Sequence, residues 1–178
     1  MPAAPFFPCQ LAAAPLLGML GDESRRMRIG VISDTHGLLR PEAVAALAGS
    51  DIILHAGDVG DPAVLEGLRA IAPVKAVRGN VDTEAWALSL PLTERIQVEG
   101  KVLYLLHNVH HLRVDPAAAG LHMLICGHTH RPMIREENGV VLLNPGSAGP
   151  RRFRLPVSVA RIHATADALR AELVPLNV

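Results

Sequence analysis

Two histidines separated by one residue, His128 and His130, follow a short apolar run in this sequence. The run, residues 121–125, has the composition of a buried strand, so both histidines are expected in extended chain beyond its end. Side chains two positions apart in extended chain point the same way, and neutral imidazole is the commonest metal ligand. Gly127 lacks a Cβ, which lets backbone and imidazoles approach a bound ion. Taken alone, the motif fits two ordinary surface histidines equally well.

Four further strand ends carry side chains of the same chemical kind. They supply Asp34 and His36 after the first expected strand, Asp58 after the second, Asn80 after the third, and His107 at the end of a hairpin strand. Singly, an aspartate or asparagine after a strand is usually a turn or helix-cap residue. Chance placement at five strand ends, four of them beside a glycine, is a poor explanation. The set therefore predicts a metal site.

The seven side chains offer oxygen and nitrogen donors and no thiolate. This donor set suits Mn²⁺, Fe²⁺ or Zn²⁺ better than a Ca²⁺ cage or a structural cysteine-type zinc site. Seven ligands are too many for one ion and fit two ions if one carboxylate bridges. Two ions roughly 3.5–4 Å apart form the usual clamp for phosphoryl transfer. Two-metal sites also cleave amides, so an amide hydrolase is an alternative.

The elements that must position these residues alternate in the first half of the chain. Strands are predicted at 28–33, 51–55 and 74–78, with helices at 41–48 and 62–70 between them. This order predicts a largely parallel sheet with its loops at the carboxyl edge. The second half changes character, with hairpins predicted at 94–98 with 101–107, 133–136 with 140–143, and 157–163 with 169–175, and a short helix near 115–119 before strand 121–125. The mixture predicts two packed sheets with helices outside.

Composition limits the classes of partner. The 178 residues suit one domain with a substantial core, and 17 basic residues balance 17 acidic ones. Aromatic residues make up 3% of the chain, so neither charge nor stacking surface indicates nucleic acid or an anionic membrane. No apolar run reaches the length of a membrane span. Cys9 and Cys126 lie in different contexts, which argues against a disulfide framework and favours a cytoplasmic protein.

Residues 1–26 differ from the rest of the chain. Four prolines interrupt their short apolar pieces, and no Lys or Arg precedes Arg25, unlike a signal peptide. We expect a disordered extension, or a start codon assigned too early, because the first strand opens directly after Met27. The predicted domain is therefore residues 27–178.

The ordered set of motifs resembles the calcineurin-like metallophosphoesterases, especially the small bacterial and archaeal phosphodiesterases of the YfcE type. The motifs are Asp34-x-His36, Gly57-Asp58, Gly79-Asn80, His107, Gly127-His128-x-His130 and Asn144-Pro145-Gly146-Ser147. The resemblance runs from about Met27 to the end of the chain. It implies an α/β fold, a four-layer α/β/β/α sandwich of two mixed sheets.

The resemblance also implies roles for the seven residues. Asp34, His36 and His130 would hold one divalent metal, Asn80, His107 and His128 the other, and Asp58 would bridge them. Mn²⁺ is the first choice of metal, with Zn²⁺, Fe²⁺, Ni²⁺ and Mg²⁺ as alternatives. A hydroxide held between the metals would attack small phosphodiesters, with Asp58 and Asn80 as catalytic residues. The alternatives are a phosphomonoesterase, or a non-catalytic scaffold like the eukaryotic branch in the retromer coat, whose metal site is altered. Relatives often form dimers or tetramers, so a homo-oligomer is a further expectation.

Two positions depart from the family pattern. Asn108 stands where the family often has glycine, which narrows the approach to His107. Val81 stands where larger phosphatases carry a histidine that serves the leaving group, so weak activity on poor leaving groups is expected. His110, His111, Arg78, Arg131 and the cluster 151–154 are each open to two interpretations, substrate contact or solvated surface.

Overall fold

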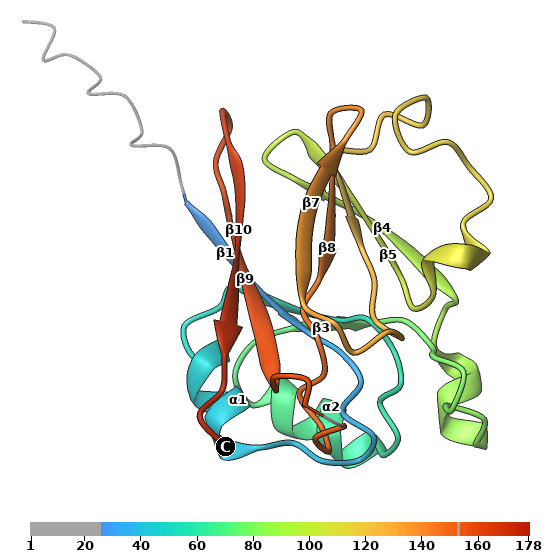
Figure 1. The fold of residues 1–178 in the computed structure, drawn as a ribbon, viewed down its shortest axis with the longest axis vertical. Coiled ribbons are helices and arrows are strands. Elements are labelled where there is room, and N and C mark those ends of the chain that lie inside the picture. Colours follow the sequence, from blue (N-terminus) through green and yellow to red (C-terminus); the bar gives the residue numbers. More distant parts are fainter. Residues whose placement is uncertain (1–25, 153) are drawn as a thin grey trace, which may run out of the picture.

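The computed structural model of the chain describes residues 26–152 and 154–178. Its strands form two five-stranded sheets that pack together (Figure 1). The first sheet contains β1 (Met27–Ile32), β2 (Ile52–His55), β3 (Val74–Ala76), β9 (Ser158–Ala164) and β10 (Leu169–Pro175). The second contains β4 (Thr93–Val98), β5 (Lys101–Leu106), β6 (Met123–Ile125), β7 (Met133–Glu137) and β8 (Val140–Asn144). The predicted extension lies outside the described residues, apart from residue 26, and so does Cys9.

The first sheet has the order β10-β9-β1-β2-β3. β1, β2 and β3 are parallel, and β9 and β10 add an antiparallel hairpin at one side. The crossovers are the helices α1 (Pro41–Leu47) and α2 (Pro62–Arg69), each opening with proline, and both pack against the same face of this sheet (Figure 1). The carboxylate of Asp61 accepts the N–H of Ala63 and caps α2. The predicted βαβαβ unit is confirmed.

The second sheet has the order β4-β5-β6-β8-β7 and is also mixed. Two hairpins close through Glu99-Gly100 and Asn138-Gly139, where all four residues have positive φ as two-residue hairpin turns require. Two 3-10 helices, η1 (Ala85–Ser89) and η2 (Val109–His111), were not predicted.

The short helix predicted near 115–119 is wrong. The N–H of Ala119 donates to the Asp115 carbonyl at 2.9 Å, but Gly120 then turns to a φ of +67°. The segment is therefore a turn, because a left-handed residue ends a helical path after one turn.

The main core lies between the two sheets, where strand residues alternate in direction. Leu103 and Leu105 of β5 face the first sheet, whereas Val102 and Leu106 face outward beneath η2 and the following turn. The predicted fold class, a layered α/β sandwich of two mixed sheets, is confirmed, although η2 and turns stand in for an α-helix on this outer face. Within the described residues no helix is long and apolar enough to cross a membrane.

Candidate metal centre

The loops that follow five strands meet at one edge of the sandwich. Backbone hydrogen bonds join them: the Asp34 N–H donates to the Gly57 carbonyl at 3.0 Å, and the Gly127 N–H donates to the His107 carbonyl at 3.0 Å. The two sheets are linked here as well, because the Ala148 N–H donates to the Ser33 carbonyl at 3.1 Å. These loops carry all seven predicted ligands, namely Asp34 and His36 after β1, Asp58 after β2, Asn80 after β3, His107 after β5, and His128 and His130 after β6.

Three of the ligands form what we call the Asp34 half: Asp34, His36 and His130. The Nε2 atoms of His36 and His130 lie 3.3 Å apart, and their rings are stacked with centroids 5.2 Å apart. The His130 Nε2 lies 3.3 Å from the Oδ1 of Asp34. One nitrogen of each ring and one carboxylate oxygen therefore converge on a common point, which is the arrangement that a metal ion requires.

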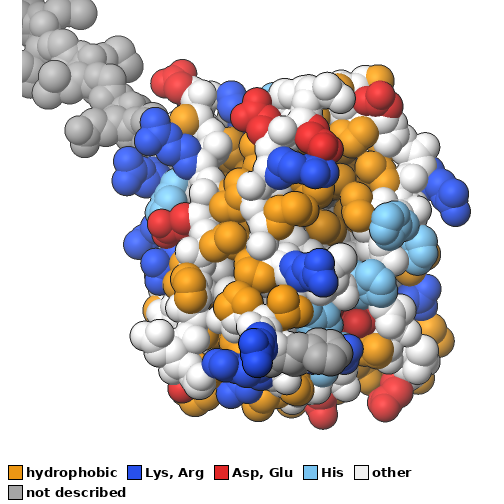
Figure 2. Space-filling view, viewed as in Figure 1, with side chains coloured by type: hydrophobic (Ala, Val, Ile, Leu, Met, Phe, Trp, Pro, Cys, Tyr) orange, Lys and Arg blue, Asp and Glu red, His pale blue; other side chains and the backbone are white. Residues whose placement is uncertain are grey.

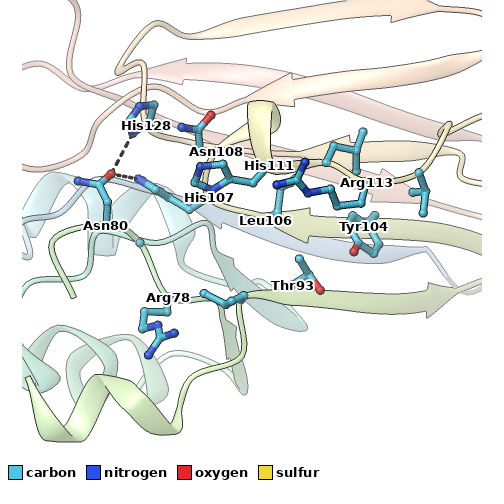
Figure 3. Close-up of a pocket in the computed structure, with 14 residues that line it drawn as sticks. Arg78, Asn80, Thr93, Tyr104, Leu106, His107, Asn108, His111, Arg113 and His128 are labelled. Atoms are coloured by element: carbon cyan, nitrogen blue, oxygen red, sulfur yellow. Dashed lines mark hydrogen bonds between the residues drawn. The ribbon is translucent and has the colours of Figure 1, made fainter. Parts of the chain in front are cut away.

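The Asn80 half consists of Asn80, His107 and His128. The Oδ1 of Asn80 lies 3.0 Å from the His107 Nε2 and 3.0 Å from the His128 Nδ1 (Figure 3). The two histidines thus present different ring nitrogens to the same oxygen. Three donor atoms again converge, this time with an amide oxygen in place of a carboxylate.

Asp58 lies between the two halves. Its Oδ2 is 3.3 Å from the His107 Nε2 and 4.0 Å from the His36 Nε2. Its Oδ1 accepts the N–H of Val81 at 3.0 Å, which fixes the carboxylate. One oxygen of Asp58 therefore faces both halves, as the predicted bridge requires. The Asp34 carboxylate is also placed centrally, since it lies within 4.8 Å of the ligand atoms of Asp58 and His107.

The environment of His107 fixes which of its nitrogens can bind a cation. Its Nδ1 lies 2.8 Å from the Ala56 carbonyl oxygen, which can only accept, so Nδ1 carries a proton and Nε2 faces the site. Burial lowers the pKa of His107, but the hydrogen bond and charge of Asp58 outweigh it and leave this pKa raised. Burial raises the pKa of Asp58, but His107 and the Val81 N–H outweigh it and leave that pKa lowered. Both shifts favour the charged forms of the two side chains, so a cation that binds the His107 Nε2 would compete with a proton there.

The backbone is strained at the ligands. Asp34, His36, Asp58, His128 and His130 have φ between +47° and +69°. Among the other described non-glycine residues only Glu99 and Asn138, in the hairpin turns, have positive φ. Such a conformation costs about 1–2 kcal/mol for each residue with a Cβ. Strain concentrated on five of seven predicted ligands points to a functional constraint on those loops.

Two glycines allow the ligand loops to pack this closely. A Cβ on Gly79 would lie 2.1 Å from the Oδ1 of Asp58, and one on Gly127 would lie 1.9 Å from the Oγ of Ser33. The sequence interpretation of Gly127, close approach of imidazoles to an ion, differs from what the structure shows. Glycine is needed there because the loop passes directly over Ser33 and Asp34.

Asp82 is a positioning residue that the sequence motifs did not predict. Its buried carboxylate accepts three backbone N–H groups, from Val59 at 3.2 Å, Gly60 at 2.9 Å and Gly79 at 2.8 Å. It therefore ties the loop that carries Asp58 to the loop that carries Asn80. The spacing of Gly79 and Asp82 is a signal for such a loop-internal bond.

The sequence motifs did not predict a role for His55 either, because its only sequence signal is its place at the end of a strand. It is fully buried, its Nε2 lies 2.9 Å from the Thr35 Oγ1, and its Nδ1 accepts the Gly57 N–H at 3.2 Å. Burial lowers the pKa of His55 to about 4. A neutral imidazole thus braces the loops after β1 and β2 from beneath.

The Asn144-Pro145-Gly146-Ser147 motif braces the remaining loops. The amide of Asn144 donates to the Gly127 carbonyl at 2.7 Å and to the Thr129 Oγ1 at 3.1 Å. The Ser147 hydroxyl donates to the Asp34 carbonyl at 2.9 Å. The motif therefore fixes the backbone beside Asp34 and His128.

The residues with two possible interpretations, substrate contact or solvated surface, lie in different parts of the structure. The Arg152 Nη2 lies 3.4 Å from the His36 Nε2. Figure 2 shows exposed histidine side chains close to basic side chains of lysine or arginine. His111 lines a cavity next to the Asn80 half and His110 does not. Arg78 and Asn108 line the same cavity, and the Asn108 Oδ1 also caps η2 by accepting the His110 N–H. Arg131 does not line it.

Known proteins resemble this chain in sequence and in fold. Residues 27–167 match the calcineurin-like phosphoesterase superfamily domain. A probable metallophosphoesterase of Methanothermobacter thermautotrophicus is 39% identical over 160 residues, covering 83% of this chain and 92% of that protein. The phosphodiesterase YfcE of Escherichia coli K12 is 32% identical over 158 residues, covering 74% and 85%. Vacuolar Protein Sorting 29 of Cryptosporidium parvum superposes with a TM-score of 0.69 at 20% identity, covering 85% and 98%, a likeness of fold.

Proposed function

This chain belongs to the calcineurin-like phosphoesterase superfamily, and from that premise we propose that it hydrolyses small phosphodiesters with two divalent metal ions. In the proposed reaction the oxygen of water adds to phosphorus and one P–O ester bond breaks. The leaving oxygen takes up a proton, so the products are a phosphate monoester and an alcohol or phenol. One observation carries the proposal, namely that the donor atoms of seven side chains converge in two halves that share Asp58.

The donor set fits the proposed metals. Asp34, His36 and His130 would hold one ion, Asn80, His107 and His128 the other, and Asp58 both. Oxygen and imidazole donors without a thiolate suit Mn²⁺, our first choice, and also Zn²⁺, Fe²⁺, Ni²⁺ or Mg²⁺. Ions bound there would supply acidification of a water molecule and stabilisation of charge on the phosphoryl oxygens.

The side chains themselves contribute positioning and charge. The Oδ1 of Asn80 faces both imidazoles of its half, so its amide N–H groups point elsewhere and can donate to a phosphoryl oxygen (Figure 3). Arg152 places a guanidinium beside His36. A cation next to a metal-binding half becomes favourable when an anionic substrate lies between them, which supports a role in holding phosphate. The chain has two cysteines and Cys126 is buried, a sparse cysteine usage that supports a reducing, cytoplasmic location.

A panel assay tests this function. The full chain, stripped of metal, is assayed against phosphodiesters, phosphomonoesters and nucleotides with Mn²⁺, Zn²⁺, Mg²⁺ and Ni²⁺ added separately. We expect metal-dependent hydrolysis, fastest with Mn²⁺ and faster on bis(4-nitrophenyl) phosphate than on 4-nitrophenyl phosphate. The reverse preference would make the chain a phosphomonoesterase.

The non-catalytic scaffold is the rival from another class. It predicts a chain that hydrolyses no ester with any of the four metals, even when metal analysis finds both sites filled. That result would overturn the proposed function.

A further inference from the structure

A cavity of about 870 Å³ opens beside the Asn80 half. All three side chains of that half line it, so it is continuous with the candidate metal centre. Its volume is within the usual range for small-molecule sites, about 300–1,000 Å³. In Figure 3 its labelled residues run from Asn80 and His128 at one end to Tyr104 and Arg113 at the other. The cavity extends well beyond the room that a phosphate group needs.

Aliphatic side chains form much of the cavity wall. They come from β5 and from the segments before β4 and after η2, and they are Leu92, Leu106, Leu112 and Val114. Leu92 and Val114 are 62% and 47% exposed, so large apolar surface remains in water at this place. An apolar group bound there would remove that surface from water, which is favourable in proportion to its area.

The charged side chains in the cavity wall all have one sign. Arg78 and Arg113 line it, and no aspartate or glutamate does. Within residues 26–152 and 154–178, no carboxylate lies within 4.0 Å of either guanidinium. Arginine without a carboxylate partner in an apolar pocket is a typical anchor for a ligand anion.

We propose that this cavity binds the second ester group of the substrate, and that this group is apolar and carries an anionic group of its own. The inference rests on the proposed function, because the metal centre is taken to hold the reacting phosphate. Apolar walls with two cations and no acid match an amphiphilic anion, and a hydrophilic diester would leave the walls in water. Such substrates are diesters of an apolar alcohol or phenol that bears a carboxylate or a further phosphate.

Three diesters with one leaving group test the proposal. Each carries a 4-nitrophenyl ester, and the second ester group is methyl, hexyl or 5-carboxypentyl. Because the leaving group is constant, differences in kcat/KM report the second group. Burial of the added methylenes is expected to raise kcat/KM for the hexyl diester at least about tenfold over the methyl diester. The carboxypentyl diester is expected to exceed the hexyl one, despite its additional negative charge.

Matched variants locate the effect. Leu92 lines the cavity and Leu88 does not, yet both are 62% exposed. Leu92→Gln should reduce kcat/KM for the hexyl diester about fivefold and leave the methyl diester unchanged, whereas Leu88→Gln should change neither. Arg113→Gln should remove only the advantage of the carboxylate, and Arg95→Gln, an exposed position outside the cavity, should not. Equal effects within either pair would overturn the proposal.

Failure of the cavity assignment and failure of the enzyme function give different results. Metal-dependent hydrolysis of all three diesters at equal kcat/KM would overturn the cavity assignment and leave the proposed function standing. Absence of hydrolysis with every metal would overturn the function, and the cavity is then judged by binding alone. The apolar anion 1-anilinonaphthalene-8-sulfonate should bind the metal-free chain, more weakly after Leu92→Gln or Arg113→Gln than after Leu88→Gln. Equal fluorescence titrations for those variants would overturn the cavity assignment.

Discussion

The two halves of the candidate metal centre contain similar side chains and differ in their surroundings. In the Asp34 half, Asp34 and His130 are 0% and 5% exposed, and the Asn144–Ser147 motif braces the loops from behind. In the Asn80 half only His107 is buried, and Asn80 and His128 are exposed at the mouth of the cavity. The protein therefore encloses one half and leaves the other open. Enclosure fixes ligand geometry, and the open half leaves room for the substrate in the function that we propose.

Loss of the link between the halves should have the largest effect. Asp58→Asn removes the charge that faces both halves and keeps the side-chain shape. We expect turnover to be abolished and metal content to fall below two ions per chain, because a bridging carboxylate holds both ions. Metal analysis and steady-state rates measure this. Asp61→Asn, which retains an N-cap side chain outside the site, is the control and should keep both properties. Two ions and a near-normal rate in Asp58→Asn would refute the bridging role.

Asp82 tests whether the open half depends on bracing from below. Asp82→Asn leaves one acceptor oxygen for three backbone N–H groups. We expect the free energy of unfolding to fall by about 2–3 kcal/mol, since hydrogen bonds to a charged group are worth about 1.5–3 kcal/mol. Metal binding should weaken as the Gly79-Asn80 loop loosens. Urea unfolding measures the first effect and metal titration the second. Asp167→Asn, in the exposed β9–β10 turn, is the control, and equal losses in the two variants would contradict the bracing role.

Features of the site with a local sequence signal could be predicted, and features imposed by distant contacts could not. Ligand types at strand ends are readable because short apolar runs mark the strands, and a histidine, aspartate or asparagine directly after one stands out. The hairpin turns at Glu99-Gly100 and Asn138-Gly139 could be predicted, because a two-residue turn that contains glycine itself requires positive φ. At Asp34 or His128 the same backbone conformation has no local signal, because contacts across the fold impose it.

The features that were missed depend on distant pairs. Asp82 acts on the loop after β2, 22 to 23 residues away, and His55 acts on Thr35, 20 residues away. The cavity is built from residues between Arg78 and His128, which no single stretch of sequence indicates. Residues 115–120 form no helix, because Gly120 has a left-handed conformation and ends the path after a single helical turn. The side-chain types at the strand ends could be predicted, whereas the hydrogen bonds that join one loop to another could not.

His55 lies beneath both halves, and we expect it to make the stability of the metal-free chain depend on pH. Its folded pKa of about 4 is below the unfolded value of 6.5, so the unfolded chain takes up a proton first as pH falls. Stability from this residue is present above pH 6.5 and lost toward pH 4, with roughly 2–3 kcal/mol lost between pH 6.5 and 4.5. His107 has a raised pKa, and its contribution is instead lost as pH rises.

The difference in the free energy of unfolding between wild type and His55→Gln, followed over pH, separates the contribution of His55 from the opposing contribution of His107. Glutamine can donate to Thr35 but cannot titrate, so the variant should lose less stability than wild type over the same pH interval. Urea unfolding at several pH values gives the comparison. Parallel stability curves for the two proteins would show that His55 is not kept neutral by the fold.

The smallest effect is expected at Val81, at the open half. A leaving alkoxide must be protonated or stabilised as the ester bond breaks, and general acid help is worth about 10²–10⁴-fold. Val81 is 42% exposed and offers no proton. We therefore expect rates to depend steeply on leaving-group acidity, with activated aryl diesters cleaved far faster than alkyl diesters. Single-turnover rates over a series of leaving groups measure the slope.

A histidine at position 81 should do little to flatten that slope. An imidazole acts as an acid when a partner orients it, and the neighbouring Asp82 is the natural candidate. Its carboxylate is already occupied by three backbone N–H groups, so Val81→His is expected to raise alkyl-ester rates by less than about threefold. If wild type cleaves alkyl and nitrophenyl esters equally fast, another group must supply the proton. His111 would then be the first residue to replace, because it lines the cavity beside the Asn80 half, and the open half would prove to hold a general acid that the enclosed half lacks.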